Sequence, residues 1–138
     1  DIEIIDGEEE ARLALTGCAA ILNPHIPHAV VFDIGGGSTE IIWLRLLQNH
    51  RGRPGYPIPF EVIDTISLPY GVVTMSESYA QFASSPAIHQ NIRNSVAQEL
   101  KTFVVRNQID DHIEKGSIQL VGSSGTVTTL AAIQVGLS

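Results

Sequence analysis

Two patterns of hydrophobic residues occur along the chain, one typical of β-strands and one typical of helices, and together they predict its elements. Runs rich in apolar and β-branched residues predict strands, and they occupy residues 29–34, 40–47, 60–68 and 118–121. Segments in which apolar residues recur every three or four positions predict helices, and these begin near residues 7, 74, 86 and 125. With a further strand at residues 2–5, the order of the elements predicts an α/β fold with a mixed β-sheet flanked by helices.

Short capping motifs mark where the predicted helices begin. Asp6 and Glu9 have the spacing of a capping box, and so do Thr74 and Glu77. Pro86 follows a serine and occupies the first position of a long helix, where proline is favoured. The core-facing stripe predicted for this long helix consists of Ile88, Ile92, Val96, Leu100, Phe103 and Val104.

Composition narrows the class of protein without assigning a function. The 138 residues are one domain's worth of chain, with 43% hydrophobic and 17% charged residues, as is typical of a soluble α/β domain. A net charge of −7 argues against binding to nucleic acid. Cys18 is the single cysteine, which excludes an intrachain disulfide, and its place on an apolar helix face predicts a buried thiol. No run of 18 apolar residues occurs, so we expect no membrane span and a cytoplasmic setting.

The turn between the strands at 29–34 and 40–47 carries the most specific chemistry. Asp33 ends the first strand, three glycines occupy residues 35–37, two hydroxyl residues follow, and Glu40 begins the next strand. Glycines can take backbone angles closed to other residues, so the turn can present successive N–H groups to an anion. The two carboxylates are ligands that Mg²⁺ prefers. The alternative is a plain hairpin turn, although a turn without function rarely needs three glycines.

A strand, and not a helix, follows the glycines, which disfavours a Rossmann or P-loop site. The other polar and aromatic candidates are not assigned to a site. No two of the five histidines have a metal-ligand spacing on one helix face, and we interpret Trp43 and Tyr70 as packing residues. Residues 48–59 are rich in proline and cationic side chains and are predicted to form a solvated loop.

Four segments of the chain match, in the same order, the motifs of one known family. Residues 33–40 read Asp-Ile-Gly-Gly-Gly-Ser-Thr-Glu and resemble a phosphate motif. Residues 4–13 resemble the segment SGEEEARL, with Asp6 in place of the serine, and residues 67–73 resemble SLPLGAVRL. Residues 120–131 resemble GTGGTxTxLA but depart from it at Ser123-Ser124, which leaves the backbone less free there. These motifs are similar to those of the exopolyphosphatase/guanosine pentaphosphate phosphatase family, in the actin and sugar-kinase superfamily.

The resemblance implies a phosphatase that removes terminal phosphate from inorganic polyphosphate or guanosine pentaphosphate. Glu10 matches the family's proposed catalytic base, although the helix dipole alone favours glutamates in a first helical turn. Asp33 and Glu40 would hold Mg²⁺, partly through waters. The implied phosphate-binding residues are Gly35, Gly36, Gly37, Ser38, Thr39, Gly125 and Thr126.

Both ends of the sequence lie inside predicted elements, so we interpret the chain as an excised piece of a longer protein. Residues 1–24 would be the end of a first lobe, and residues 25–138 a second, ribonuclease-H-like (actin-like ATPase) lobe that is truncated at its C-terminus. We expect this piece to be inactive alone, because its cleft would have only one wall. We also expect it to pair with itself, as a homodimer, through the unpaired strand predicted at residues 2–5. Two alternatives stay open: a nucleotide-binding lobe of an actin-like ATPase or sugar kinase, and a non-catalytic phosphate-sensing module.

Overall fold

A computed structural model of the chain describes residues 13, 15–47, 58–79 and 85–137. Four strands form one mixed sheet in the order β3-β2-β1-β4. They are β1 (His28–Ile34), β2 (Thr39–Leu46), β3 (Phe60–Leu68) and β4 (Ile118–Ser123). The pairs β1–β2 and β2–β3 are antiparallel, whereas β1 and β4 run parallel. These bounds confirm the strands predicted at 29–34, 40–47, 60–68 and 118–121 to within two residues, and the strand predicted at 2–5 lies outside the described residues.

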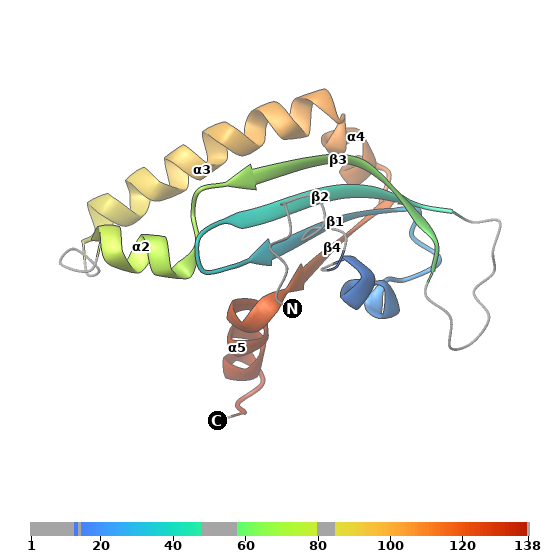
Figure 1. Cartoon of the computed structure of the whole chain (residues 1–138). Helices are drawn as coiled ribbons and strands as arrows, with labels where there is room; N and C mark the ends of the chain where they lie inside the picture. Colours follow the sequence, from blue (N-terminus) through green and yellow to red (C-terminus); the bar gives the residue numbers. More distant parts are fainter. Residues whose placement is uncertain (1–12, 14, 48–57, 80–84, 138) are drawn as a thin grey trace, which may run out of the picture.

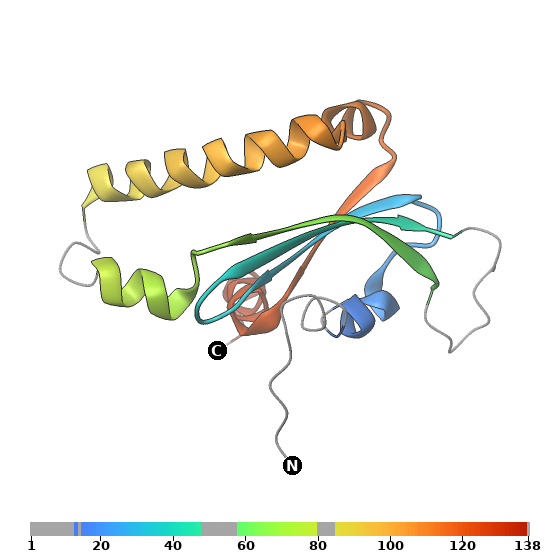
Figure 2. The same ribbon diagram turned by 45° about the horizontal axis from the view of Figure 1, so that its top comes forward.

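Helices cover both faces of the sheet, as predicted for a ribonuclease-H-like lobe. Residues 15–18 are helical and continue into the short 3-10 helix η1 (Ala19–Ile21). The later helices are α2 (Val72–Tyr79), α3 (Pro86–Arg106), α4 (Ile109–Glu114) and α5 (Ser124–Gln134). Figures 1 and 2 show α3 and α4 on one face, with η1 and α5 toward the other. None of the described helices combines the length and apolar character that crossing a membrane needs.

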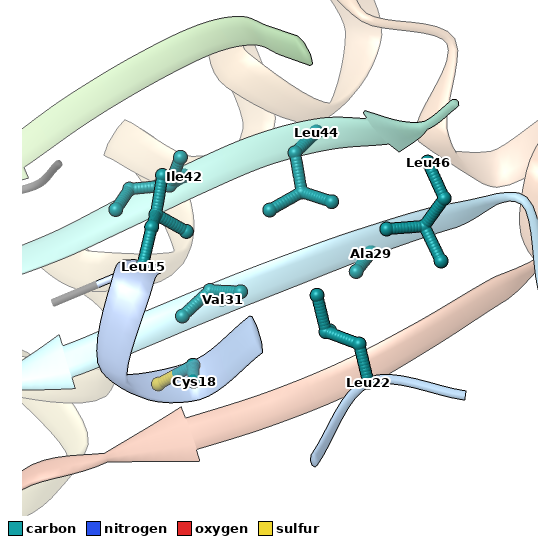
Figure 3. Close-up of a cluster of buried hydrophobic side chains, with 8 residues drawn as sticks. All are labelled: Leu15, Cys18, Leu22, Ala29, Val31, Ile42, Leu44 and Leu46. Atoms are coloured by element: carbon teal, nitrogen blue, oxygen red, sulfur yellow. The ribbon is translucent and has the colours of Figure 1, made fainter. Parts of the chain in front are cut away.

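The first core cluster packs the N-terminal helical segment against β1 and β2 (Figure 3). The strands alternate in the usual way, so every second residue of β1 and β2 faces this cluster. Cys18 is 5% exposed, which confirms the predicted buried thiol. The eight buried members are Leu15, Cys18, Leu22, Ala29, Val31, Ile42, Leu44 and Leu46.

The second core cluster lies on the opposite face of the sheet, under α3 and α4. Trp43 and Phe103 are its largest fully buried side chains, which confirms Trp43 as a packing residue. Within the stripe predicted for α3, Phe103 is buried, whereas Val96, Leu100 and Val104 are half-buried against the cluster. The C-terminal half of α3 therefore supplies most of the contact with the sheet.

Two helix predictions need correction. α2 begins at Val72 and not after Thr74, because Thr74 is the third residue of the helix. The hydroxyl of Thr74 accepts a hydrogen bond from the Gly71 N–H at 2.9 Å. Thr74 therefore caps the helix from its third position, by binding the residue that precedes the helix. α4 was not predicted; at six residues it is too short to show a helical period, although Ile109 is buried.

A cluster of rings at the start of β1 was also not predicted. The rings of His28 and Trp43 are stacked, with centroids 5.2 Å apart and planes 14° apart, and the His28 and His112 centroids are 4.1 Å apart. Burial, followed by the neighbouring His112, lowers the pKa of His28 below its ordinary value. The two histidines come from a strand and from α4, so a search for spacing on one helix face does not find them.

Candidate functional site

The candidate site lies at the edge of the sheet where β1, β3 and β4 end and β2 begins. One row of polar residues crosses all four strands there. Glu40 is the cross-strand partner of both Asp33 on β1 and Ser67 on β3, and Asp33 is in turn the partner of Ser123 on β4. Cross-strand partners project to the same face of a sheet. The row therefore continues, at the sheet edge, the face that carries the first core cluster.

The two carboxylates of this row are direct neighbours. Asp33 and Glu40 occupy opposed positions on antiparallel strands, where like charges repel and destabilise the pair. Glu40 is held in place by two hydroxyls, because its Oε1 accepts hydrogen bonds from Ser38 Oγ at 2.6 Å and from Ser67 Oγ at 3.0 Å. A hard cation between the carboxylates would relieve their repulsion. The donor set therefore suits Mg²⁺, which binds proteins through one or two carboxylates and completes its shell with water and phosphate oxygens.

The carbonyl groups of the glycine turn accept hydrogen bonds from the first turn of α2. The Gly35 carbonyl accepts from Val72 N–H at 3.0 Å, and the Gly36 carbonyl accepts from Val73 N–H at 2.8 Å and from Thr74 N–H at 3.2 Å. The Gly37 carbonyl lies 3.2 Å from the Thr74 hydroxyl, which can donate to it. Successive carbonyls of the turn thus point at α2.

This arrangement fixes where the N–H groups of the turn point. In a trans peptide the N–H is directed opposite to the carbonyl of the preceding residue, and the described peptide bonds are trans. The N–H groups of Gly36, Gly37 and Ser38 therefore all face away from α2. Among the described residues, none accepts a hydrogen bond from these three groups. Three successive N–H donors of this kind can together bind an anion.

The reason for the glycines differs from the expected one. Gly35, Gly36 and Gly37 do not adopt left-handed backbone angles, so the expectation that the turn needs angles closed to other residues is wrong. A Cβ on Gly37 would meet no atom within 4 Å, and one on Gly36 would touch only Val73 at an ordinary 3.5 Å. The protein itself therefore leaves room for side chains at residues 36 and 37, whereas a Cβ on Gly35 would lie a tight 3.3 Å from the Ser38 carbonyl oxygen. What the missing side chains provide is open access to the backbone N–H groups.

The first turn of α5 borders the same loop from the other side. The hydroxyls of Ser124 and Thr126 approach the Ile34 carbonyl at 2.8 and 3.4 Å, which ties the start of α5 to the end of β1. Ser123 occupies the N-cap position but makes no capping bond, and its Oγ is buried without a partner among the described residues. The N-terminus of α5 thus brings unneutralised N–H dipoles to the site.

The structure gives the predicted site residues different positions. It brings Asp33, Glu40, the glycine turn, Gly125 and Thr126 to one edge of the sheet. The Ser38 and Thr39 hydroxyls donate to Glu40 and to the Tyr70 carbonyl, so both act inside the loop. Glu10 lies outside the described residues.

Sequence reasoning missed three contributors to the site: Ser67, Gly71 and Thr74. Each was noticed as part of a motif, but none was given a role. Ser67 lies near the end of β3 and reaches Glu40, whereas Gly71 and Thr74 follow β3 and reach the turn. These contacts form only because β3 lies beside β2.

A comparison with protein families matches residues 1–137 to the Ppx/GppA phosphatase family. The exopolyphosphatase 2 of Mycobacterium tuberculosis (strain CDC 1551 / Oshkosh) is 33% identical over 135 residues, which cover 95% of this chain and 35% of that protein. The guanosine-5'-triphosphate,3'-diphosphate pyrophosphatase of Aliivibrio fischeri (strain MJ11) is 32% identical over 135 residues, which cover 98% of this chain and 24% of that protein. The chain thus spans about a third or less of these relatives.

Solved structures give the same picture of the fold. An exopolyphosphatase-like protein superposes with a TM-score of 0.58 at 29% identity, covering 98% of this chain and 38% of the other. The PPX-GPPA enzyme of Aquifex aeolicus superposes with a TM-score of 0.52 at 30% identity, covering 96% and 37%.

Proposed function

The chain belongs to the Ppx/GppA phosphatase family, and from this premise we propose that it is part of a hydrolase that releases terminal phosphate from inorganic polyphosphate, guanosine pentaphosphate or both. The observation that carries the proposal is the row of N–H groups at residues 36–38, which have no acceptor among the described residues, beside the Asp33–Glu40 pair. The printed names of the two relatives, an exopolyphosphatase and a guanosine-5'-triphosphate,3'-diphosphate pyrophosphatase, support the same two substrates.

Phosphoryl transfer needs positioning and charge stabilisation more than covalent help from the protein. In the proposed reaction, the N–H groups of residues 36–38 bind the oxygens of the terminal phosphoryl group, where negative charge is spread in the transition state. The start of α5, with Gly125 and Thr126, faces the same phosphates with its positive end. Asp33 and Glu40 would hold Mg²⁺, which when bound would neutralise charge on the phosphate oxygens.

The proposed chemical step is hydrolysis of a phosphoanhydride bond. A water oxygen attacks the terminal phosphorus, the bond from that phosphorus to the bridging oxygen breaks, and the shortened chain leaves with the bridging oxygen. Glu10 accepts the proton of the attacking water, a role that rests on its place in the family motif. The Ser38 hydroxyl keeps Glu40 in position through its 2.6 Å hydrogen bond. Ser38 and Thr39 thereby act on phosphate binding through the loop they hold.

The full-length protein provides the test. Phosphate release is measured in parallel from polyphosphate, guanosine pentaphosphate and ATP, with Mg²⁺ and with a chelator. Glu10→Gln should lower turnover on the preferred substrate by about 10²–10⁴-fold while substrate affinity changes little, because the variant keeps the shape of the base but cannot accept a proton.

Glu9→Gln is the matched control, since Glu9 precedes the proposed base directly in the sequence. If Glu9→Gln lowered turnover strongly and Glu10→Gln only mildly, the catalytic base would be Glu9 and not Glu10. Hydrolysis of ATP in preference to both other substrates would favour an ATPase lobe instead.

Two further parts of the proposal concern assembly and location: that the protein is a homodimer, and that it works in the cytoplasm. Light scattering of the purified full-length protein tests the first, and fractionation of the source cells tests the second.

A further inference from the structure

Gly71 touches the glycine turn more closely than a side chain would allow. A Cβ at this position would lie 2.3 Å from the Gly36 carbonyl oxygen, 2.4 Å from its carbon and 2.5 Å from the Gly37 nitrogen. Gly71 does not have a left-handed φ, so its backbone angles do not demand glycine. The contact with the turn alone excludes a side chain, because every atom in the way is backbone and cannot rotate aside.

The first N–H groups of α2 donate their hydrogen bonds to the glycine turn. The first N–H groups of a helix lack partners inside the helix, and together with the dipole they commonly bind an anion. Here Val72, Val73 and Thr74 donate them to the carbonyls of Gly35 and Gly36. The N-terminus of α2 is therefore not a phosphate site of its own, although it lies at the same edge of the sheet.

Thr74 completes the contact with its side chain. Its hydroxyl accepts from Gly71 N–H at 2.9 Å and lies 3.2 Å from the Gly37 carbonyl and 3.0 Å from the Gly71 carbonyl. It can thus connect residue 71 to the far end of the turn. Val72 and Val73 contribute their backbone to the contact, and their side chains are about half exposed.

We propose that Gly71 and Thr74 are positioning residues of the phosphate site: together with the backbone at the start of α2 they orient the carbonyls of residues 35–37 toward α2, and so aim the N–H groups of residues 36–38 at the substrate phosphate. This inference rests on the proposed function. It adds residues that touch neither substrate nor metal, and a hydrogen-bond contact through which they act.

The test uses the full-length protein and two kinds of variant. Gly71→Ala forces the turn to move, and a displacement of about 1 Å at a reacting group can lower activity by about 100-fold. We therefore expect kcat/KM for polyphosphate to fall by about that factor. Thr74→Val removes the hydroxyl and keeps the shape, so it should lower kcat/KM by about threefold to tenfold, the worth of one hydrogen bond.

Three controls separate positioning from general loss of structure. Thr74→Ser keeps the hydroxyl and should restore most of the activity that Thr74→Val loses. Gly17→Ala replaces a glycine whose Cβ would meet nothing within 4 Å, and it should be as active as the wild type. Asp64→Asn weakens the contact between β3 and α3, away from the turn, and should lower the unfolding temperature without changing kcat/KM.

Binding gives a second readout that does not depend on turnover. Polyphosphate affinity, measured by calorimetry in the Glu10→Gln background, should fall in Thr74→Val and recover in Thr74→Ser. If wild-type protein neither binds polyphosphate nor releases phosphate from any substrate, the proposed function is refuted. If wild-type protein is active and Gly71→Ala and Thr74→Val match it in kcat/KM and affinity, the positioning inference alone is refuted.

Discussion

Ser124 shows how one residue can stand where a glycine is expected. Its φ of 75° lies in the left-handed region, which costs residues with a Cβ about 1–2 kcal/mol. In the family segment that residues 120–131 resemble, this position is a glycine. The sequence predicted that the departure would restrict the backbone, and the backbone does adopt an angle that disfavours serine. Ser124 offsets part of this cost through the 2.8 Å hydrogen bond that its hydroxyl donates to the Ile34 carbonyl.

Two substitutions at this residue separate strain from hydrogen bonding. Ser124→Ala keeps the strained φ and loses the hydrogen bond, so the free energy of unfolding should fall by about 1 kcal/mol. Ser124→Gly loses the same bond but relieves the strain, so it should be more stable than Ser124→Ala by about 1 kcal/mol. Urea unfolding of both variants provides the measurement. Equal stabilities would mean that the left-handed angle costs nothing here.

The residues of the site were predicted unevenly from the sequence, for a physical reason. Asp33 and Glu40 flank one turn, so their pairing across a hairpin follows from local sequence, and the structure makes them partners. Gly71 lies more than 30 positions farther along the chain, and its contact with Gly36 arises only when β3 pairs with β2. Local spacing contains no signal for such a contact between two backbones.

At the scale of elements, strands were easier to predict than helices. Each strand is a continuous apolar or alternating run bounded by glycine, proline or polar residues, and β3 matches its predicted bounds at both ends. The start of α2 was misplaced because its first N–H groups are satisfied by the turn of residues 35–37 and not by a local side chain. α4 follows Gln108, whose φ of 52° separates it from α3.

β3 makes two ion pairs of different kinds: one joins it to the end of α3 and the other joins it to β2. Asp64 accepts from Arg106 Nε at 2.5 Å and from the Asn107 side chain at 2.6 Å, which ties the end of α3 to the sheet. Among the described residues Glu61 pairs with Arg45 only, and both of those side chains are about half exposed. Asp64→Asn should therefore lower the free energy of unfolding by about 1 kcal/mol, more than Glu61→Gln, which should cost less than about 0.5 kcal/mol.

Chemical denaturation at neutral pH checks this ranking. Burial alone would raise the pKa of Asp64, but the hydrogen bonds from Arg106 and Asn107 outweigh it and hold that pKa below its ordinary value. A larger loss in Glu61→Gln than in Asp64→Asn would contradict the assignment of α3's attachment to residue 64.

At the scale of the whole molecule, groups of polar or ionisable side chains lie at both ends of the sheet. The proposed phosphate site occupies one end, and the ring cluster of His28, Trp43 and His112 occupies the other, where it joins β1, β2 and α4. The Nδ1 of His28 is buried without a hydrogen-bond partner in the described part of the chain. Arg45 also acts on His28, in the same direction as His112. Burial, His112 and Arg45 therefore oppose protonation of His28 and outweigh a hydrogen bond with the Ser117 backbone, which raises its pKa.

This cluster predicts how the stability of the whole molecule depends on pH. The pKa of His28 is lower in the folded chain than in the unfolded chain, where it is about 6.5. As pH falls below about 6.5, the unfolded chain takes up the proton first, so the free energy of unfolding decreases. Above that pH, His28 is neutral in both states and contributes no pH dependence. Urea unfolding at a series of pH values from 8 to 5, about the range over which histidine titrates, should show this loss.

His28→Phe keeps a ring beside Trp43 and removes the titrating group, so it should flatten the decline below pH 6.5. His89→Gln, on the exposed surface of α3, is the matched control and should leave the decline unchanged. A decline of the same size in His28→Phe and the wild type would assign the pH dependence to other groups.

The contact between α2 and the turn of residues 35–37 has a consequence for how this site tolerates mutation. Val72 and Val73 make their part of the contact with main-chain atoms, and their side chains are 49% and 53% exposed. Sequence drift at these two positions can therefore proceed without disturbing the loop, provided that the helix still begins there. Residue 71 has no such freedom, because any Cβ collides with the backbone of the turn. A saturation library over residues 71–73 would accordingly retain function with many residue types at 72 and 73, and with glycine alone at 71.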